Sequence, residues 1–119
     1  MGNQFVDQRK HKRYAATDKA IAICNTKVGR IIDISRGGMA VIFTSNDSFS
    51  GEDRTTIFSK YKNLLIEEIP MIFVREIDTQ STPTSPFQIR TVGIQFNYSN
   101  SEQQDQIKQY LTGLTLSDN

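Results

Sequence analysis

The sequence has very few of the residues that build disulfides, metal sites or catalytic centres. Its 119 residues include one cysteine, Cys24, and one histidine, His11. One cysteine excludes an internal disulfide, and the two residues provide no ligand spacing for zinc. Together with the scattered carboxylates, they also lack any spacing of nucleophile, base and orienting group that indicates catalysis. We therefore expect a protein that is not an enzyme, holds no metal or cofactor and works in a reducing compartment.

Long apolar runs and an excess of charge of one sign are also missing. No stretch approaches the roughly 18 apolar residues that span a membrane, and residues 1–8 lack the apolar core of a signal peptide. Lys and Arg number 14 against 13 Asp and Glu, a formal net charge of +1, which gives no global attraction to DNA or to an anionic membrane. We expect a cytoplasmic protein of one small domain, without DNA as a partner, that is a monomer or a weak dimer.

Short apolar segments separated by polar turns are abundant. They are rich in β-branched and bulky side chains, which suit a pleated sheet. The predicted strands are 20–24, 28–32, 39–43, 55–58, 64–66, 70–77 and 87–96. Large apolar residues share one face within three of them: Ile21 with Ile23, Met39 with Val41 and Phe43, and Val92 with Ile94 and Phe96. Pro70 is expected at a strand start or edge, and Thr79–Pro86 as a hairpin loop.

The C-terminal stretch predicts an amphipathic helix. Four apolar residues fall at i, i+3, i+4 and i+7: Ile107, Tyr110, Leu111 and Leu114. Ser101 with Gln104 forms a capping box at the start, and Ser99 with Glu102 is an overlapping alternative. Gly113 is expected to end the helix in a left-handed cap. Many short strands and one terminal helix predict a small antiparallel barrel with the helix covering an open end.

The segment Asp33-Ile34-Ser35-Arg36-Gly37-Gly38 connects two predicted strands. Two consecutive glycines permit positive φ and leave backbone N–H groups free of side chains where a ligand could approach. A carboxylate and a hydroxyl flank them. Considered alone, this is most simply a hairpin in which Asp33 and Ser35 satisfy local backbone donors.

A basic cluster precedes the first predicted strand. Arg9 and Arg13 lie four positions apart, with Lys10, His11 and Lys12 between them. Considered alone, such a cluster is usually a solvated arm with no specific partner.

Together and in this order, the two patterns resemble the signature of PilZ domains, the bacterial receptors for cyclic di-GMP. Arg9 and Arg13 match its R-x-x-x-R half, and Asp33, Ser35 and Gly38 match its D-x-S-x-x-G half. The last predicted strand followed by a helix is similar to the way these domains end. The resemblance implies a mainly β protein, a six-stranded antiparallel barrel with a C-terminal helix. It would occupy residues 9–119 as a single domain, after a flexible segment 1–8.

The resemblance also implies a ligand site for cyclic di-GMP. Arginine forks match the O6 and N7 acceptors of guanine and can stack on the base, and a carboxylate matches its N1–H and N2–H donors. The implied ligand residues are Arg9, Arg13, Asp33, Ser35 and Gly38, with Arg36 and Gly37 as further contacts. Ligand-induced ordering of the arm would relay the signal to an effector protein in the motility, secretion or exopolysaccharide machinery.

Two other classes of function stay open. One is a PilZ-like adaptor that contacts proteins without binding nucleotide, although both halves of the signature are intact. The other is a small β-barrel that binds single-stranded nucleic acid. That class needs exposed aromatic residues interleaved with basic ones along the strands, whereas the basic residues here cluster in the arm.

Overall fold

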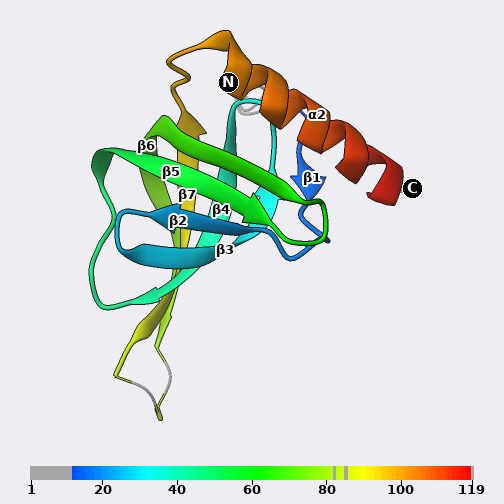
Figure 1. Ribbon diagram of the computed structural model, residues 1–119. Helices are drawn as coiled ribbons and strands as arrows, with labels where there is room; N and C mark the ends of the chain where they lie inside the picture. Colours follow the sequence, from blue (N-terminus) through cyan, green and yellow to red (C-terminus); the bar gives the residue numbers. More distant parts are fainter. Residues whose placement is uncertain (1–11, 82, 85, 119) are drawn as a thin grey trace, which may run out of the picture.

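The structure, a computed structural model, describes residues 12–81, 83–84 and 86–118 (Figure 1). The predicted flexible segment 1–8 and the first arginine of the arm therefore lie outside the described residues. The elements in chain order are β1 (Tyr14–Ala15), β2 (Ile21–Cys24), β3 (Lys27–Ile34), β4 (Gly38–Ser45), β5 (Gly51–Ser59), β6 (Leu64–Ser81), β7 (Gln88–Phe96) and α2 (Ser101–Asp118).

Six strands close into an antiparallel barrel. They follow the order β3-β2-β5-β6-β7-β4, and β4 pairs back with β3 to complete the ring. Strand β1 lies outside the ring and pairs with β3 alone. Closure leaves the six strands of the ring with neighbours on both sides over most of their length, which removes the exposed edges of an open sheet. The predicted six-stranded antiparallel barrel with a C-terminal helix is confirmed.

The barrel interior is filled by the alternate residues of each strand. Met39, Val41 and Phe43 are buried together from β4, as the alternation predicts. In β2 the inward face is formed by Ala22 and Cys24, while the larger isoleucines of this strand are half-buried on the outer face. A small closed barrel holds few large side chains, so small residues on one strand leave room for the bulky residues of others.

Strand β6 is longer than the sequence predicts, because 64–66 and 70–77 belong to one strand of 18 residues. Pro70 therefore lies inside a strand, which corrects the expectation of a strand start or edge. The ladder between β5 and β6 is irregular just before it, between Thr55 and Ile57, and Glu68 there has a φ of 54°. A bulge of this kind interrupts the regular hydrogen bonding that proline would disrupt. The Pro70 carbonyl still accepts a 2.7 Å hydrogen bond from the N–H of Asn97.

Strands β6 and β7 continue past the barrel as a projecting hairpin (Figure 1). Pairing with β5 ends at Phe73, whereas pairing with β7 continues to Ser81. The strand therefore includes the first three residues of the predicted loop Thr79–Pro86, and the connection is shorter than expected.

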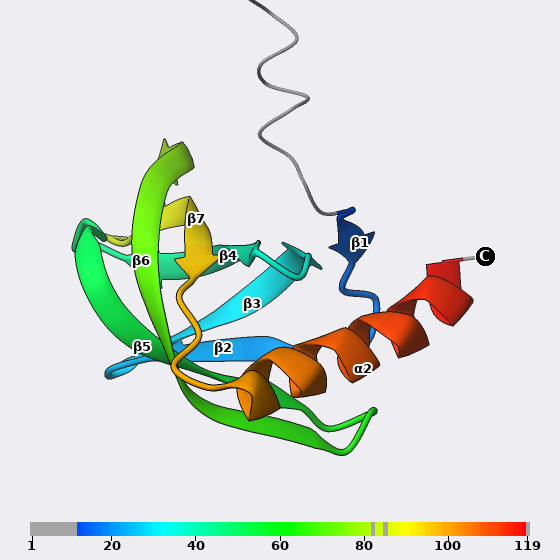
Figure 2. The same cartoon turned by 90° about the horizontal axis from the view of Figure 1, so that it is seen from above.

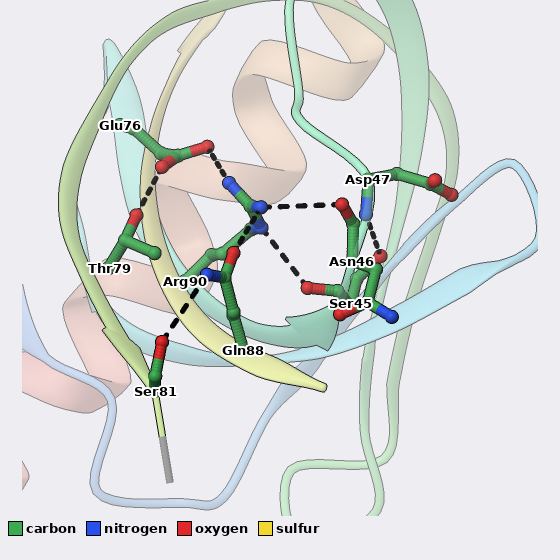
Figure 3. A network of polar contacts seen from close by, with 8 residues as sticks. All are labelled: Ser45, Asn46, Asp47, Glu76, Thr79, Ser81, Gln88 and Arg90. Carbon is green, nitrogen blue, oxygen red and sulfur yellow. Dashed lines mark hydrogen bonds and ion pairs between the residues drawn. The ribbon is translucent and has the colours of Figure 1, made fainter. Parts of the chain in front are cut away.

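Arg90 braces the root of this hairpin (Figure 3). Its guanidinium donates to the Ser45 carbonyl at 3.1 Å and to the Glu76 carboxylate at 2.6 Å, and also to the Asn46 carbonyl and the Gln88 amide oxygen. Hydrogen bonds from the Thr79 hydroxyl and from Arg90 lower the pKa of Glu76. One side chain thereby ties the hairpin to the end of β4.

Helix α2 begins at a different cap from either predicted one. The side chain of Asn100 accepts a 2.9 Å hydrogen bond from the N–H of Gln103, so Asn100 is the N-cap, and neither Ser101 nor Ser99 has this role. The Gln103 amide donates at 2.9 Å and 3.1 Å to the carbonyls of Glu67 and Glu68 at the β6 bulge. The Gln103 side-chain oxygen, which a capping box would use as its acceptor, instead accepts a 3.4 Å hydrogen bond from the Ser99 hydroxyl.

Gly113 does not end the helix, which corrects the predicted left-handed cap. The helix continues to Asp118, and Gly113 is not among the glycines with positive φ. The next residue, Leu114, is fully buried and extends the apolar stripe of the helix. All four predicted stripe residues are buried, and α2 crosses one end of the barrel beside β1 (Figure 2).

A buried carboxylate joins α2 to the segment between β1 and β2. Asp18 accepts a 2.6 Å hydrogen bond from the Ser59 hydroxyl, and the Tyr110 hydroxyl lies 2.8 Å and 2.9 Å from its two oxygens. Burial, together with the hydrogen bond to Asp18 and its charge, raises the pKa of Tyr110. Three segments far apart in the sequence thus meet at one side chain.

Candidate functional site

The two halves of the sequence signature meet beside β1. The pairing of β1 with β3 sets Tyr14 opposite Ile34 and Ala15 opposite Asp33. Arg13 comes directly before β1, and its Nη1 lies 3.2 Å from Oδ1 of Asp33. The two side chains remain 43% and 31% exposed, so the ion pair is accessible from solvent. Arg9, the other arginine of the pattern, lies outside the described residues.

The hydroxyl of Ser35 is used within the corner between β3 and β4. Its oxygen accepts hydrogen bonds from the N–H groups of Gly37 and Gly38, both at 3.2 Å, and the hydroxyl donates to the Gly38 carbonyl at 3.3 Å. The N–H of Ser35 donates to the same carbonyl at 2.8 Å. Ser35 therefore satisfies local backbone donors, as the simplest interpretation of this hairpin predicts, and it shapes the corner.

Gly38 is required for a reason that the sequence does not indicate. The double glycine permits positive φ, but among the described glycines only Gly51 has one, so the corner does not use this freedom. A Cβ at Gly38 would lie 2.1 Å from the carbonyl oxygen of Ile94 on β7. The backbone of the neighbouring strand occupies the space where a side chain would be.

Tyr98 supports the corner from the other side, and sequence reasoning did not find it. Its hydroxyl donates to the Arg36 carbonyl, and its ring lies 5.5 Å from that of Phe96. The N–H of Phe96 donates to the Gly37 carbonyl at 2.9 Å. Burial raises the pKa of Tyr98. The side chain of Arg36 is exposed at the tip of the corner.

Cationic side chains surround this corner. Lys12 places its Nζ 5.5 Å from the ring centroid of Tyr14, next to the Arg13–Asp33 pair. Exposed Arg36 on the corner itself is a third cationic side chain of this region. This combination can bind an anion that also carries hydrogen-bond donors.

A separate open depression of about 650 Å³ lies between β2, β5 and the bend of β6. None of the predicted ligand residues lines it. The carboxylates of Glu52, Asp53 and Glu68 border it and would repel a phosphate, so the corner is the better anion site.

Within the described part of the chain, no group of three or more His, Cys, Asp and Glu could hold a metal ion. No helix among the described residues is long and apolar enough to cross a membrane.

Solved structures with the same fold are found among proteins of low sequence identity. The PilZ domain with c-di-GMP of YcgR from Escherichia coli has a TM-score of 0.68 at 12% identity, with 93% of this chain and 94% of that chain covered. MrkH, described as a c-di-GMP-dependent transcription regulatory factor, has a TM-score of 0.67 at 18% identity, with 91% and 51% covered. The K. pneumonia MrkH–c-di-GMP complex has a TM-score of 0.72 at 18% identity, with 92% and 53% covered.

At these identities the likeness shows the fold, and the chain spans about half the length of MrkH. No curated protein matches the sequence. The family assignment comes from the sequence itself, since the PilZ domain model matches residues 7–113, which is nearly the whole chain. The chain belongs to the PilZ domain family.

Proposed function

We propose that the chain binds cyclic di-GMP between the basic arm and the corner at residues 33–38. The observation that carries this proposal is the 3.2 Å Arg13–Asp33 ion pair, which brings the two halves of the signature together while leaving both side chains partly exposed. The solved PilZ domain of YcgR and the MrkH complex both contain c-di-GMP, which supports the same ligand here.

The chemistry of the pair suits a guanine nucleotide. Without ligand, Arg13 and Asp33 satisfy each other. A bound guanine would offer N1–H and N2–H to the carboxylate and O6 and N7 to the guanidinium, and a phosphate would give the arginine a second anionic partner. Ligand binding would then exchange one charge-assisted contact for several, with Arg9 as a second arginine from the arm.

The remaining signature residues have different proposed roles. Ser35 positions the corner through its three hydrogen bonds, and Gly38 allows β4 to approach β7. Arg36, whose side chain is exposed, and Gly37 beside it form the part of the corner that contacts the ligand. Contact of the ligand with the arm would fix the arm against β3 and change the surface presented to an effector protein.

Calorimetric titration tests the binding proposal. Cyclic di-GMP is titrated into the protein, with GTP and cyclic di-AMP as controls, and the titration is repeated with Arg13→Ala and Asp33→Asn. Each of these side chains would make a charge-assisted contact that the bound ligand shields from water, and losing one should cost about 2 to 5 kcal/mol of binding free energy. Arg13→Lys should restore little, because lysine has neither the planar fork nor the stacking surface.

Arg54→Ala is the matched control, since Arg54 is an exposed arginine beside the separate depression. It should bind as the unaltered protein does. Absence of binding heat from folded protein would reject the proposal and leave the adaptor alternative. Equal losses in Arg13→Ala and Arg54→Ala would show that only general positive charge matters.

A further inference from the structure

The corner between β3 and β4 presents a cation that the fold itself does not use. Arg36 lies at the tip of the corner with an exposed side chain, and its guanidinium forms no ion pair with a described residue. The carboxylate of the corner, Asp33, is already paired with Arg13. Within residues 33–38, Arg36 is therefore the charged group that remains available for an anionic ligand.

The backbone of the corner adds little for an anion. The N–H groups of Gly37 and Gly38 both donate to the hydroxyl oxygen of Ser35 at 3.2 Å, and the Ser35 N–H donates to the Gly38 carbonyl at 2.8 Å. A phosphate would have to displace the Ser35 oxygen to bind the two glycine donors. The affinity of the corner for an anion therefore depends on the Arg36 guanidinium and on how firmly that side chain is presented.

The peptide group between Arg36 and Gly37 is held on both sides. Its carbonyl oxygen accepts a hydrogen bond from the Tyr98 hydroxyl, 62 residues later in the chain, and its N–H donates to the Ser35 hydroxyl oxygen. A peptide group is planar, so fixing its oxygen and its N–H fixes the plane that contains the Cα atom of Arg36. The direction in which the Arg36 side chain leaves the corner therefore depends on Tyr98.

Tyr98 is itself held in place by the end of β7. Its ring lies 5.5 Å from that of Phe96 and packs against the buried core. The N–H of Phe96 donates to the Gly37 carbonyl at 2.9 Å, so this segment binds two successive carbonyls of the corner. Burial raises the pKa of Tyr98, and the charge of Arg36 acts in the opposite direction, which places the guanidinium within electrostatic range of the hydroxyl.

Folding stability alone gives little reason for the hydroxyl. The hydrogen bond to the Arg36 carbonyl lies at an exposed position, where water can replace the donor. A phenylalanine would keep the packing of the ring against Phe96 and would lose only this bond. Fixing the Arg36 carbonyl in advance has a different benefit, since it reduces the conformational entropy that the neighbouring side chain loses when it binds a ligand.

We propose that Tyr98 is a positioning residue for the ligand site, whose hydroxyl holds the Arg36 backbone so that the guanidinium is presented to a phosphate of the nucleotide. The inference rests on the proposed binding of cyclic di-GMP at residues 33–38. Arg36 lies three residues after Asp33, so their Cα atoms are at most about 11 Å apart. One dinucleotide can therefore contact the Arg13–Asp33 pair with a base and Arg36 with a phosphate.

A double-mutant cycle tests the proposal. Cyclic di-GMP is titrated calorimetrically into the full chain, into Tyr98→Phe, into Arg36→Ala and into the variant with both changes. Tyr98→Phe should weaken binding by about three- to tenfold, the loss expected when the ligand must itself order a long side chain. Arg36→Ala should weaken binding by at least as much. Adding Tyr98→Phe to Arg36→Ala should then have no further effect, because the hydroxyl acts through Arg36.

Tyr61→Phe is the matched control, since it removes a tyrosine hydroxyl from a side chain that is 71% exposed. It should bind the nucleotide as the unaltered protein does. A second measurement uses no ligand and follows the Gly37 N–H by amide hydrogen exchange. The Gly37 N–H should exchange faster in Tyr98→Phe, because its peptide group is then held on one side only, and at the unaltered rate in Tyr61→Phe.

Four results would overturn the inference and leave the proposed function in place. They are unaltered binding by Tyr98→Phe, unaltered binding by Arg36→Ala, an equal loss from Tyr98→Phe with and without Arg36, and unchanged exchange at Gly37. The third result would show that Tyr98 supports the corner as a whole. Absence of binding heat from the unaltered protein would reject the proposed function, and this inference with it.

Discussion

Replacing Gly38 by alanine separates a packing role for this residue from a role in ligand approach. The new Cβ would lie 2.1 Å from the Ile94 carbonyl oxygen, 3.2 Å from the carbonyl carbon and 3.3 Å from Cα of Gln95. All three atoms belong to the backbone of β7, which no change of side-chain rotamer can move. A carbon and a carbonyl oxygen approach to about 3.3 Å at closest. One of the strands must therefore shift by about 1 Å or more.

The expected loss of stability follows from that shift. Overpacking costs about 1 to 3 kcal/mol and sometimes more. The shift also disturbs the hydrogen bond from Phe96 to the Gly37 carbonyl and those of Ser35 to this corner, each worth about 1 kcal/mol. We expect Gly38→Ala to lower the free energy of unfolding by about 3 to 5 kcal/mol, a large fraction of the roughly 5 to 15 kcal/mol of a typical domain.

Urea unfolding followed by circular dichroism measures this loss, and Gly93→Ala on β7 is the control. A Cβ at Gly93 would have its nearest contact at 3.7 Å, with Cδ1 of Ile77. The unfolding free energy of the Gly93→Ala variant should change by less than about 1 kcal/mol. If Gly38→Ala kept its stability but lost cyclic di-GMP binding, the glycine would serve the ligand and the packing argument would be refuted.

Four further predictions concern the helix and the core. Tyr110→Phe should lower the unfolding free energy by about 1.5 to 3 kcal/mol, because the buried Asp18 carboxylate loses a hydrogen-bond donor. As a control, Tyr61→Phe at an exposed position should leave urea unfolding unchanged. Asn100→Ala should cost about 1 kcal/mol in the same assay, while Ser101→Ala and Ser99→Ala should cost a few tenths or less. Burial raises the pKa of the Cys24 thiol to about 11, so a thiol reagent at pH 8 should label the protein only in urea. Because this folded pKa lies above the ordinary thiol pKa of about 8.5, its stability contribution is complete below that pH and is lost as pH rises towards 11. Cys24→Ala should then show a shallower alkaline decline, and an unchanged decline would contradict the assignment.

The features that depend on local patterns were predictable from the sequence. The strand alternation in 39–43 and 92–96, and the stripe beginning at Ile107, report which faces are buried, and their burial is confirmed. The family signature needs only the order and spacing of Arg9, Arg13, Asp33, Ser35 and Gly38, and the matching family model confirms the family. Residue roles at the site stay predictions.

The errors concern residues whose environment comes from distant strands. The sequence predicts that Gly38 leaves room for a ligand to approach, but the constraint that the structure shows is the backbone of β7, which arrives at this point only through barrel closure. Pro70 is tolerated inside a strand because of a bulge in the pairing with β5. No pattern near Tyr98 indicates that its hydroxyl reaches Arg36, 62 residues earlier.

The two ends of α2 are set by contacts with the rest of the domain, because the local sequence offers several nearly equal positions for each end. Ser99, Asn100 and Ser101 are all good caps, and their intrinsic preferences differ by only a few tenths of a kcal/mol. Gln103 binds the carbonyls of the β6 bulge, which fixes where the helix starts. At the other end, Gly113 stays helical because burial of Leu114 compensates the roughly 1 kcal/mol helical cost of glycine.

The contact between Asp18 and Tyr110 also constrains the order in which the domain is completed. The two residues are 92 positions apart, so the contact closes a loop over most of the chain. During synthesis the N-terminal segments leave the ribosome first, and contacts of such long range form late. We expect the segment that carries Arg13 to wait for the helix before it takes its final place on β3. A ribosome-bound chain arrested before α2 should therefore show barrel signals in amide exchange without protection at Tyr14 and Ala15. Protection there at that stage would show that β1 docks without the helix.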